Sequence, residues 1–210
     1  MYQKYAKRLI DLLLSACAIV VLSPVYLLIC IAIVADDPGP VFFRQKRVGI
    51  HKTHFLILKF RTMKVSTPKD VPTHLLENPE QYITRVGKFL RKTSLDELPQ
   101  IFQIFTGKMA IIGPRPALWN QFDLIAERDK YGANDVRPGL TGWAQVHGRN
   151  LASWEEKFEY DVEYVDHVSF AMDVKIIFMT IRCVLAREGI SAEGSATMEA
   201  FKGTEAALNE

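Results

Sequence analysis

The stretch Arg91-Lys92-Thr93-Ser94-Leu95-Asp96-Glu97-Leu98-Pro99-Gln100 places two adjacent acids between a basic pair and an apolar pattern. The apolar residues have the i, i+3, i+4, i+7 spacing of a helix with one buried face: Leu98, Ile101, Phe102 and Phe105. Because proline is tolerated in the first turn of a helix, Pro99 predicts that this helix begins between Ser94 and Asp96. Asp96 and Glu97 then lie at its positive end.

Two interpretations of these acids are open at this point. In the first, Ser94 and Glu97 form a capping box, and the acids only stabilise the helix N-terminus by ~0.3 to 1 kcal/mol. In the second, Asp96 is a nucleophile, and Glu97 helps it to hold a divalent cation and to accept a phosphoryl group. The rest of the chain has to distinguish them.

Length and composition fit one domain, with or without an appendage. The 210 residues are 49% hydrophobic, which allows a substantial core, and the net charge of +2 gives no indication of a nucleic-acid partner. Neither an HExxH nor a Cys-x-x-Cys pattern occurs, so a structural zinc site is not expected. Cys17, Cys30 and Cys183 lie in apolar segments, which favours reduced thiols and a cytoplasmic soluble part.

Residues 9–35 are apolar enough to enter a membrane. As one straight helix they would extend ~40 Å, more than the ~30 Å hydrocarbon core requires. Ser23-Pro24 divides them into arms of about 14 and about 11 residues, and each arm is too short to cross. Because basic residues flank both ends, a tilted spanning helix and a re-entrant hairpin are both open. A cleaved signal peptide is less favoured, because the apolar region is too long.

Two runs rich in aromatic and β-branched residues, 41–48 and 54–63, flank a turn that contains Gly49 and predict a β-hairpin. Alternation along the second run places Lys59 at the end of an apolar row formed by Phe55 and Ile57. Lys59 is either a snorkelling lysine at the sheet margin or a point charge for a phosphate.

Three arginines lie in turns rich in proline and glycine. A short buried strand, 109–112, leads into Gly113-Pro114-Arg115-Pro116, and Arg137 and Arg149 occupy similar surroundings. Prolines restrict the backbone and lower the entropy lost on binding, and arginine suits bidentate contact with phosphate. Each turn alone could be an ordinary surface turn, but together they indicate an anionic ligand.

The remaining chain is predicted to form helices up to about residue 187, after which the helical spacing of apolar residues ends. Ser153 and Glu156 form a capping box that opens one helix, and residues 170–185 form a second with a broad apolar surface. Residues 188–210 are rich in small residues and are expected to be loosely ordered. We therefore predict a membrane segment at 1–36, a catalytic domain at 37–187 and a tail at 188–210.

Several motifs in order resemble the monotopic phosphoglycosyl transferases, the bacterial sugar transferase family, in their minimal PglC-like form. The resemblance covers about residues 5–173. It rests on the Ser23-Pro24 break, FRQKRVG (43–49), KFRTM (59–63), SLDELPQ (94–100), GPRP (113–116) and RPGLTG (137–142). His147 and the Asp36-Asp37 pair depart from the family pattern and could bear on the choice of sugar.

The resemblance implies an α+β fold: a re-entrant membrane helix broken at Ser23-Pro24 carries a small cytosolic domain with a short hairpin at the membrane interface. It implies transfer of a sugar 1-phosphate from a UDP-sugar to undecaprenyl phosphate, with release of UMP, at the cytoplasmic face of the bacterial inner membrane. Asp96 would be the covalent nucleophile, with Glu97 and Mg²⁺ completing the centre. The candidate substrate-binding residues are Lys59, Arg61, Arg115, Arg137 and Arg149.

Other possibilities stay open in the sequence. The chain could be a membrane-anchored scaffold whose basic turns hold anionic lipid headgroups, or a metal-dependent transferase that works in one step without a covalent intermediate. A homodimer is possible.

Overall fold

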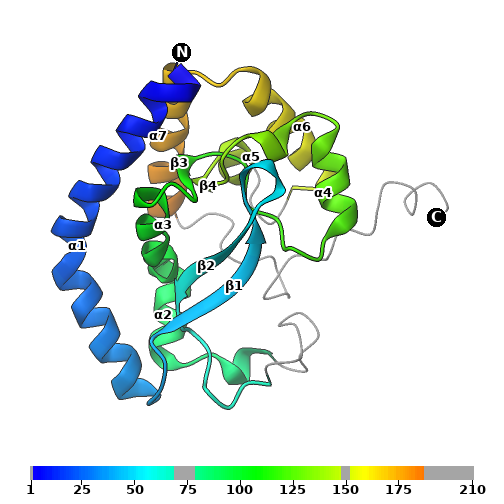
Figure 1. Ribbon diagram of the computed structural model, residues 1–210. Helices are drawn as coiled ribbons and strands as arrows, with labels where there is room; N and C mark the ends of the chain where they lie inside the picture. Colours follow the sequence, from blue (N-terminus) through cyan, green and yellow to red (C-terminus); the bar gives the residue numbers. More distant parts are fainter. Residues whose placement is uncertain (1, 69–78, 148–151, 187–210) are drawn as a thin grey trace.

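The computed structural model describes residues 2–68, 79–147 and 152–186 of the chain. It combines helices with two small sheets (Figure 1). A long helix, α1 (Lys7–Asp36), follows a short π-helical turn at Tyr2–Ala6 and runs along one side of the molecule. The mixed α and β class predicted from sequence is confirmed, whereas the predicted tail at 188–210 lies outside the described residues.

Helix α1 passes through Ser23-Pro24 without interruption, so the two separate arms of the predicted hairpin are not seen. Proline removes the N–H that would bond the Val20 carbonyl, and the Ser23 hydroxyl donates to that carbonyl instead, at 2.8 Å. The helix therefore continues, and Figure 1 shows it bowed around the rest of the chain. A bend replaces the expected break.

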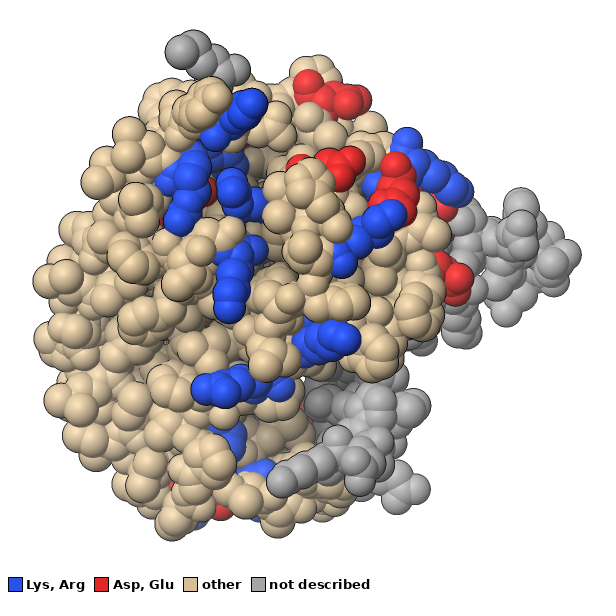
Figure 2. All heavy atoms as spheres, viewed as in Figure 1, with Lys and Arg blue, Asp and Glu red and all other residues tan. Residues whose placement is uncertain are grey.

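The outer side of α1 is apolar. Figure 2 shows no charged side chain along the left edge of the molecule, where α1 lies. Large apolar side chains are exposed along the helix: Leu9, Leu13, Leu14, Val20, Val21, Leu27, Leu28 and Ile31. By length and composition the stretch Tyr2–Asp36 could cross a membrane. A surface of this kind, exposed and without charge, identifies α1 as a possible membrane anchor.

The inner side of α1 changes character along its length. Its first half attaches through buried polar residues four apart, and Lys7 pairs with Asp173 at 2.5 Å while Asp11 accepts the Ile111 N–H at 3.1 Å. Its second half attaches through buried apolar residues, including Tyr26 and Ile33. Both halves of the helix are thus bound to the same body.

Strands β1 (Phe42–Val48) and β2 (His54–Phe60) form the predicted antiparallel hairpin. The turn between them, Ile50–Lys52, contains two residues with positive φ, His51 and Lys52. The predicted alternation is confirmed, because Phe55 and Ile57 are buried in one row and Lys59 ends that row.

Both edges of this hairpin are covered. On the β2 side the buried Gln103 accepts the Leu58 N–H at 3.0 Å and donates to the Leu56 carbonyl, in place of a third strand. On the β1 side the Val48 N–H donates to the Ala117 carbonyl at 3.0 Å, and the backbone of Arg47 forms an isolated antiparallel β-bridge with Leu118. The hairpin therefore lies between the helix that carries Gln103 and the turn that carries Arg115.

The central stretch folds differently from its prediction. Helix α2 (Arg85–Thr93) ends at Ser94, which has φ 57° and makes no side-chain cap bond, so the predicted Ser94 capping box is wrong. A 3₁₀ turn, η5 (Leu95–Gln100), carries both acids, and α3 (Ile101–Phe105) begins only after it. The left-handed conformation of Ser94 completes the preceding helix, where the sequence pattern suggested the start of the next.

The rest of the body closes around a second small sheet. Strand β3 (Ala110–Ile112) pairs in parallel with β4 (Gly139–Thr141). Around them lie four further helices: α4 (Phe122–Asp129), α5 (Trp143–His147), α6 (Trp154–Asp166) and α7 (Phe170–Ala186). The predicted capping box of Ser153 and Glu156 is present at α6. Ile112, Trp143, Tyr164 and Ile176 form the buried core of this part.

Candidate active site

Glu97 is held by two cations from different parts of the fold. Its Oε1 lies 2.6 Å from Lys59 Nζ at the end of β2 and 3.2 Å from Arg115 Nη2. Burial alone would raise the pKa of Glu97, but Arg115 and Lys59 outweigh it and hold this pKa at about 2. Glu97 is therefore ionised at any physiological pH. The structure brings together Asp96, Glu97, Lys59 and Arg115, as the sequence suggested.

Asp96 has the opposite setting on the same turn. Among the described residues, no side chain donates a hydrogen bond to its half-buried carboxylate. Burial raises the pKa of Asp96 above its ordinary value; the charge of Lys59 opposes this, Glu97 adds to it, and Arg91 opposes it. The positive charges of Lys59 and Arg91 therefore act on the Asp96 carboxylate, but among the described residues it forms no salt bridge.

Arg91 is a neighbour of the acids that was not among the predicted site residues. Its Nε donates to the Thr62 hydroxyl at 2.9 Å, and its charge interacts with Asp96. The basic pair Arg91-Lys92, just before the acids in the sequence, could have indicated this neighbour, because the last turn of α2 leads directly into η5.

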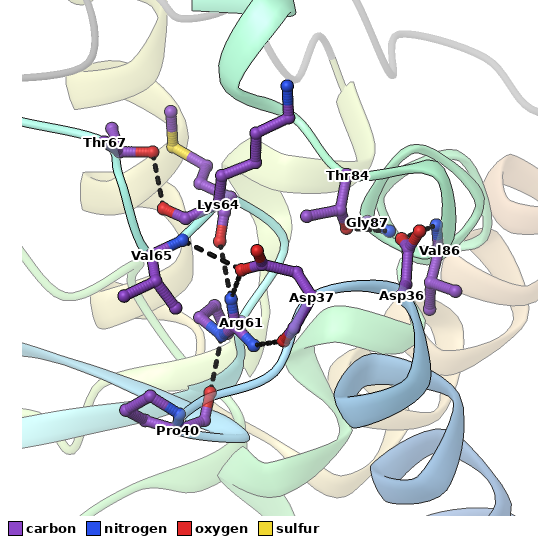
Figure 3. Close-up of polar contacts among 11 residues, drawn as sticks. Asp36, Asp37, Pro40, Arg61, Lys64, Val65, Thr67, Thr84, Val86 and Gly87 are labelled. Carbon is purple, nitrogen blue, oxygen red and sulfur yellow. Dashed lines mark hydrogen bonds and ion pairs between the residues drawn. The ribbon is translucent and has the colours of Figure 1, made fainter.

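Arg61 is bound elsewhere, which Figure 3 shows. Its guanidinium contacts the Asp37 carboxylate and backbone carbonyl, and its Nε donates to the Pro40 carbonyl at 2.5 Å. Asp37 also accepts the Val65 N–H, while Asp36 accepts the Val86 N–H at the start of α2. These bonds hold the C-terminal end of α1 in place. Arg61, Asp36 and Asp37 therefore have structural partners here and do not contact Asp96.

Of the other two predicted arginines, the structure describes Arg137 and shows it bound away from the acids. Arg137 Nε donates to the Gly107 carbonyl at 3.1 Å, at the end of the segment that follows α3. Gly107 has the positive φ, 81°, expected of a residue that ends a helix. Arg149 lies outside the described residues.

Two further arginines fix the turn that carries Arg115. Arg128 Nη1 donates to the Arg115 carbonyl at 2.7 Å and Arg47 Nη1 to the Pro116 carbonyl at 3.0 Å. Arg128 is in turn paired with the buried Asp161 at 2.9 Å. These bonds hold both carbonyls next to the Arg115 side chain, so its guanidinium is preorganised toward Glu97.

The acid pair fits a Mg²⁺ ion in its donor chemistry. Mg²⁺ prefers hard oxygen ligands and is often held by one or two carboxylates together with substrate phosphates. Asp96 supplies a carboxylate that no side chain among the described residues hydrogen-bonds, and Glu97 supplies a second carboxylate beside it. Within these residues no group of three or more potential ligands occurs, so substrate oxygens would have to complete the shell.

The family model for bacterial sugar transferases matches residues 2–187 of the chain. The chain belongs to the bacterial sugar transferase family. Among relatives of this sugar transferase, the Bacillus subtilis protein named uncharacterized sugar transferase EpsL is 43% identical, over 94% of this chain and 96% of its own length.

Two further relatives carry the names of activities. The UDP-glucose:undecaprenyl-phosphate glucose-1-phosphate transferase of Escherichia coli is 38% identical over 83% of this chain. The UDP-N-acetylgalactosamine-undecaprenyl-phosphate N-acetylgalactosaminephosphotransferase of Aeromonas hydrophila is 38% identical over 88%. The chain spans 39% and 45% of their lengths. The sugar transferase described here is an enzyme of the phosphoglycosyl transferase class.

Proposed function

We propose that this sugar transferase moves a sugar 1-phosphate from a UDP-sugar to undecaprenyl phosphate and releases UMP. The activities in the names of its relatives support the substrates. The observation that carries the proposal is the different environment of the two acids in one turn. Glu97 forms ion pairs with Lys59 and Arg115, whereas no side chain among the described residues forms a hydrogen bond with Asp96. The reaction would open the assembly of a bacterial glycoconjugate.

In the first half of the reaction, an Asp96 carboxylate oxygen attacks the β-phosphorus of the donor. The bond from this phosphorus to the bridging oxygen breaks, and UMP leaves with the bonding electrons. The phosphosugar stays on Asp96 as an acyl phosphate. Because a carboxylate is already ionised at neutral pH, no general base is needed for this step. Arg115 and Lys59 are placed to offset the charge that develops on the phosphoryl oxygens.

In the second half, a phosphate oxygen of the lipid attacks the same phosphorus and the bond to Asp96 breaks. The carboxylate is regenerated, and the product is a polyprenyl diphosphate sugar. A covalent carrier suits this chemistry because two phosphate-bearing substrates repel each other and can then bind in turn. Asp96 and Glu97 would hold Mg²⁺, which would supply charge neutralisation at the phosphoryl group.

A groove lined in part by Leu95, the residue before Asp96, supports a lipid acceptor. It has a volume of about 500 Å³, is almost entirely apolar, and lies between α1 and α2. Its lining includes Leu28 and Ile29 of α1, Phe89 of α2 and Leu95, which directly precedes Asp96. Leu28 and Phe89 are also exposed on the outer surface. A prenyl chain that reaches this groove from a bilayer would bring its phosphate close to the acid pair.

We further propose that α1 is re-entrant and that the catalytic part lies on the cytoplasmic face of the inner membrane. The bowed course of α1 in Figure 1 and the contacts of both its ends with one body support this placement. The division into a membrane segment at 1–36 and a catalytic domain at 37–187, and a homodimer, stay predictions.

The proposal is tested by measuring UMP release from the purified protein with Mg²⁺, undecaprenyl phosphate and a panel of UDP-sugars. We expect release with at least one sugar, no turnover in Asp96→Asn, and a phosphosugar trapped on the wild-type protein when the lipid is left out. Release that requires both substrates, with nothing trapped, would support a one-step transferase instead. A protein that binds anionic lipid but releases no UMP with any UDP-sugar would support the scaffold.

A further inference from the structure

Arg47 brings a positive charge to the active site without an acid of its own. Its Nη1 donates to the Pro116 carbonyl and its Nη2 to the Gln45 side-chain oxygen at 2.7 Å, and both acceptors are neutral. Its Nε is buried without a partner, and no ion pair joins Arg47 to an acid among the described residues. A guanidinium has five N–H donors, so most of its binding capacity is unused. Such a group is costly to bury unless an anion completes it.

The hairpin register directs Arg47 toward the same side as Lys59. Phe43 is paired with Lys59 and Arg47 with Phe55 across the two strands. Because directly paired residues share a face and side chains alternate along a strand, Phe43, Gln45 and Arg47 project on the face of Lys59. The charge of Arg47 interacts with Arg115 and with Glu97, and burial lowers the pKa of Arg47 to about 10.

The charges that surround the acid pair leave an excess of positive charge. Among the described residues, the charges of Lys59, Arg115, Arg91 and Arg47 interact with Asp96 or Glu97, while Arg128 is already paired with the buried Asp161. A site with this balance of charge attracts an anion and concentrates it near Asp96.

We propose that Arg47, together with Arg115, binds the diphosphate of the nucleotide-sugar donor. This assignment rests on the proposed function and deepens it by giving the donor a phosphate-binding residue on β1. In the proposed arrangement the unused N–H groups at Nη1 and Nη2 donate to phosphate oxygens, while the bonds to Pro116 and Gln45 keep the guanidinium in place.

The position of Arg47 along the hairpin favours the donor over the lipid phosphate. Phe60, at one end of the hairpin, packs against Tyr26 of α1 with ring centroids 5.6 Å apart. Arg47 lies near the other end, beside the turn whose Lys52 pairs with Asp129 of α4. Figure 1 shows that this end is directed away from α1. A water-soluble nucleotide can approach from that side while a lipid approaches from the α1 side.

The test is binding of UMP to the full chain in nanodiscs, measured by isothermal titration calorimetry. We expect Arg47→Gln to weaken UMP binding by roughly 10- to 100-fold, the range expected for losing hydrogen bonds to a charged group. The matched control is Arg44→Gln, which removes an exposed arginine from the opposite face of the same strand and should leave UMP binding unchanged. Arg47→Lys should weaken binding by a smaller factor, because it keeps the charge but not the fork of donors.

Two comparisons separate direct contact from a structural role. Uridine, which lacks the phosphate, should bind wild type and Arg47→Gln equally, and the KM for undecaprenyl phosphate should change less than twofold. In an Arg115→Gln background, Arg47→Gln should still weaken UMP binding. If it has no further effect there, Arg47 acts only by positioning Arg115, and the assignment is overturned.

The outcomes for the site and for the function can be distinguished. If wild type binds UMP and Arg47→Gln binds it equally well, the Arg47 site is wrong and the transferase reaction stands. If wild type does not bind UMP at all, both are overturned. Loss of uridine and UMP binding by the same factor would also overturn the site, since it would indicate a general distortion.

Discussion

At the scale of single residues, Asp96 and Glu97 are neighbours whose carboxyl groups cannot exchange roles. Glu97 is bound through Oε1 by Lys59 and Arg115, and their charges hold its pKa at about 2, which makes this carboxylate a weak base and a weak nucleophile. Asp96 has no such bonds to side chains among the described residues, and burial raises its pKa. The proposed nucleophile is thus the acid that has no side-chain hydrogen bond among the described residues.

The residues that hold the Arg115 turn also set its stability. Arg128 and Asp161 form a buried pair, and removing one member leaves the other charge without compensation. We predict that Asp161→Asn lowers the free energy of unfolding by ~3 to 5 kcal/mol. Lys52→Gln, which removes one member of the exposed Lys52–Asp129 pair, should leave the free energy of unfolding close to that of wild type, because solvent screens an exposed ion pair.

Urea denaturation of the purified protein, followed by tryptophan fluorescence, measures both changes. Equal small losses in Asp161→Asn and Lys52→Gln would mean that the Arg128 pair does not stabilise the turn. Because Arg128 bonds the Arg115 carbonyl, we also expect weaker UMP binding in Asp161→Asn than in Lys52→Gln.

At the scale of elements, the docking of α2 depends on Gly87. A Cβ placed there would lie 2.1 Å from the Thr62 carbonyl oxygen, a backbone atom that has little freedom to move. Gly to Ala normally stabilises a helix by ~1 kcal/mol, but here the clash reverses the sign. We predict that Gly87→Ala destabilises the protein by at least ~2 kcal/mol and increases amide exchange in α2, measured by hydrogen exchange with mass spectrometry.

A helix-favouring substitution on the open side of α2 is the control. Lys88→Ala changes an exposed position of the same helix and should leave exchange in α2 close to wild type. If Gly87→Ala is as stable as Lys88→Ala, then α2 does not pack on the segment after β2 as closely as the structure has it.

Elements defined by neighbouring residues were predictable from the sequence, and those defined by distant partners were not. The hairpin, the position of Lys59 at the end of its row and the cap at Ser153 follow from local alternation and spacing. Ser94 was misassigned because one residue can end the helix before it or begin the next, and only packing decides. Arg61 was predicted to bind substrate because it belongs to the KFRTM motif; its contact with Asp37 could not be foreseen, because Asp37 lies before β1 in the sequence and Arg61 after β2.

Arg47 is an intermediate case. Its burial and its bonds to Gln45 and Pro116 could not be read from composition or spacing. Its face could have been, because once the hairpin register is known, Arg47 projects on the same side as Lys59. Site residues on strands can therefore be found from sequence when one member of the row is already assigned.

At the scale of the whole molecule, the contacts of α1 decide how the protein can meet a bilayer. Near its N-terminus Lys7 pairs with Asp173 of α7, and Arg8 donates to the carbonyls of Ile104 and Phe105. At its C-terminus Asp36 accepts the Val86 N–H of α2. A helix whose two ends bind one body cannot cross a bilayer while that body stays on one side.

This constraint predicts the same membrane side for both ends of α1. With Cys17, Cys30 and Cys183 replaced by alanine, single cysteines at Gln3 and at Lys64 should both resist a membrane-impermeant maleimide in spheroplasts and react in inside-out vesicles.

Replacing Ser23 and Pro24 together by leucine should straighten the helix and break the Lys7–Asp173 contacts. Part of the Gln3→Cys population should then reach the outer face. Val21→Leu, an exposed apolar position of the same helix, is the control and should leave labelling unchanged. Labelling of Gln3→Cys from outside in the unaltered helix would mean that α1 spans the bilayer, and the contacts at its N-terminus would then have to be absent in the membrane.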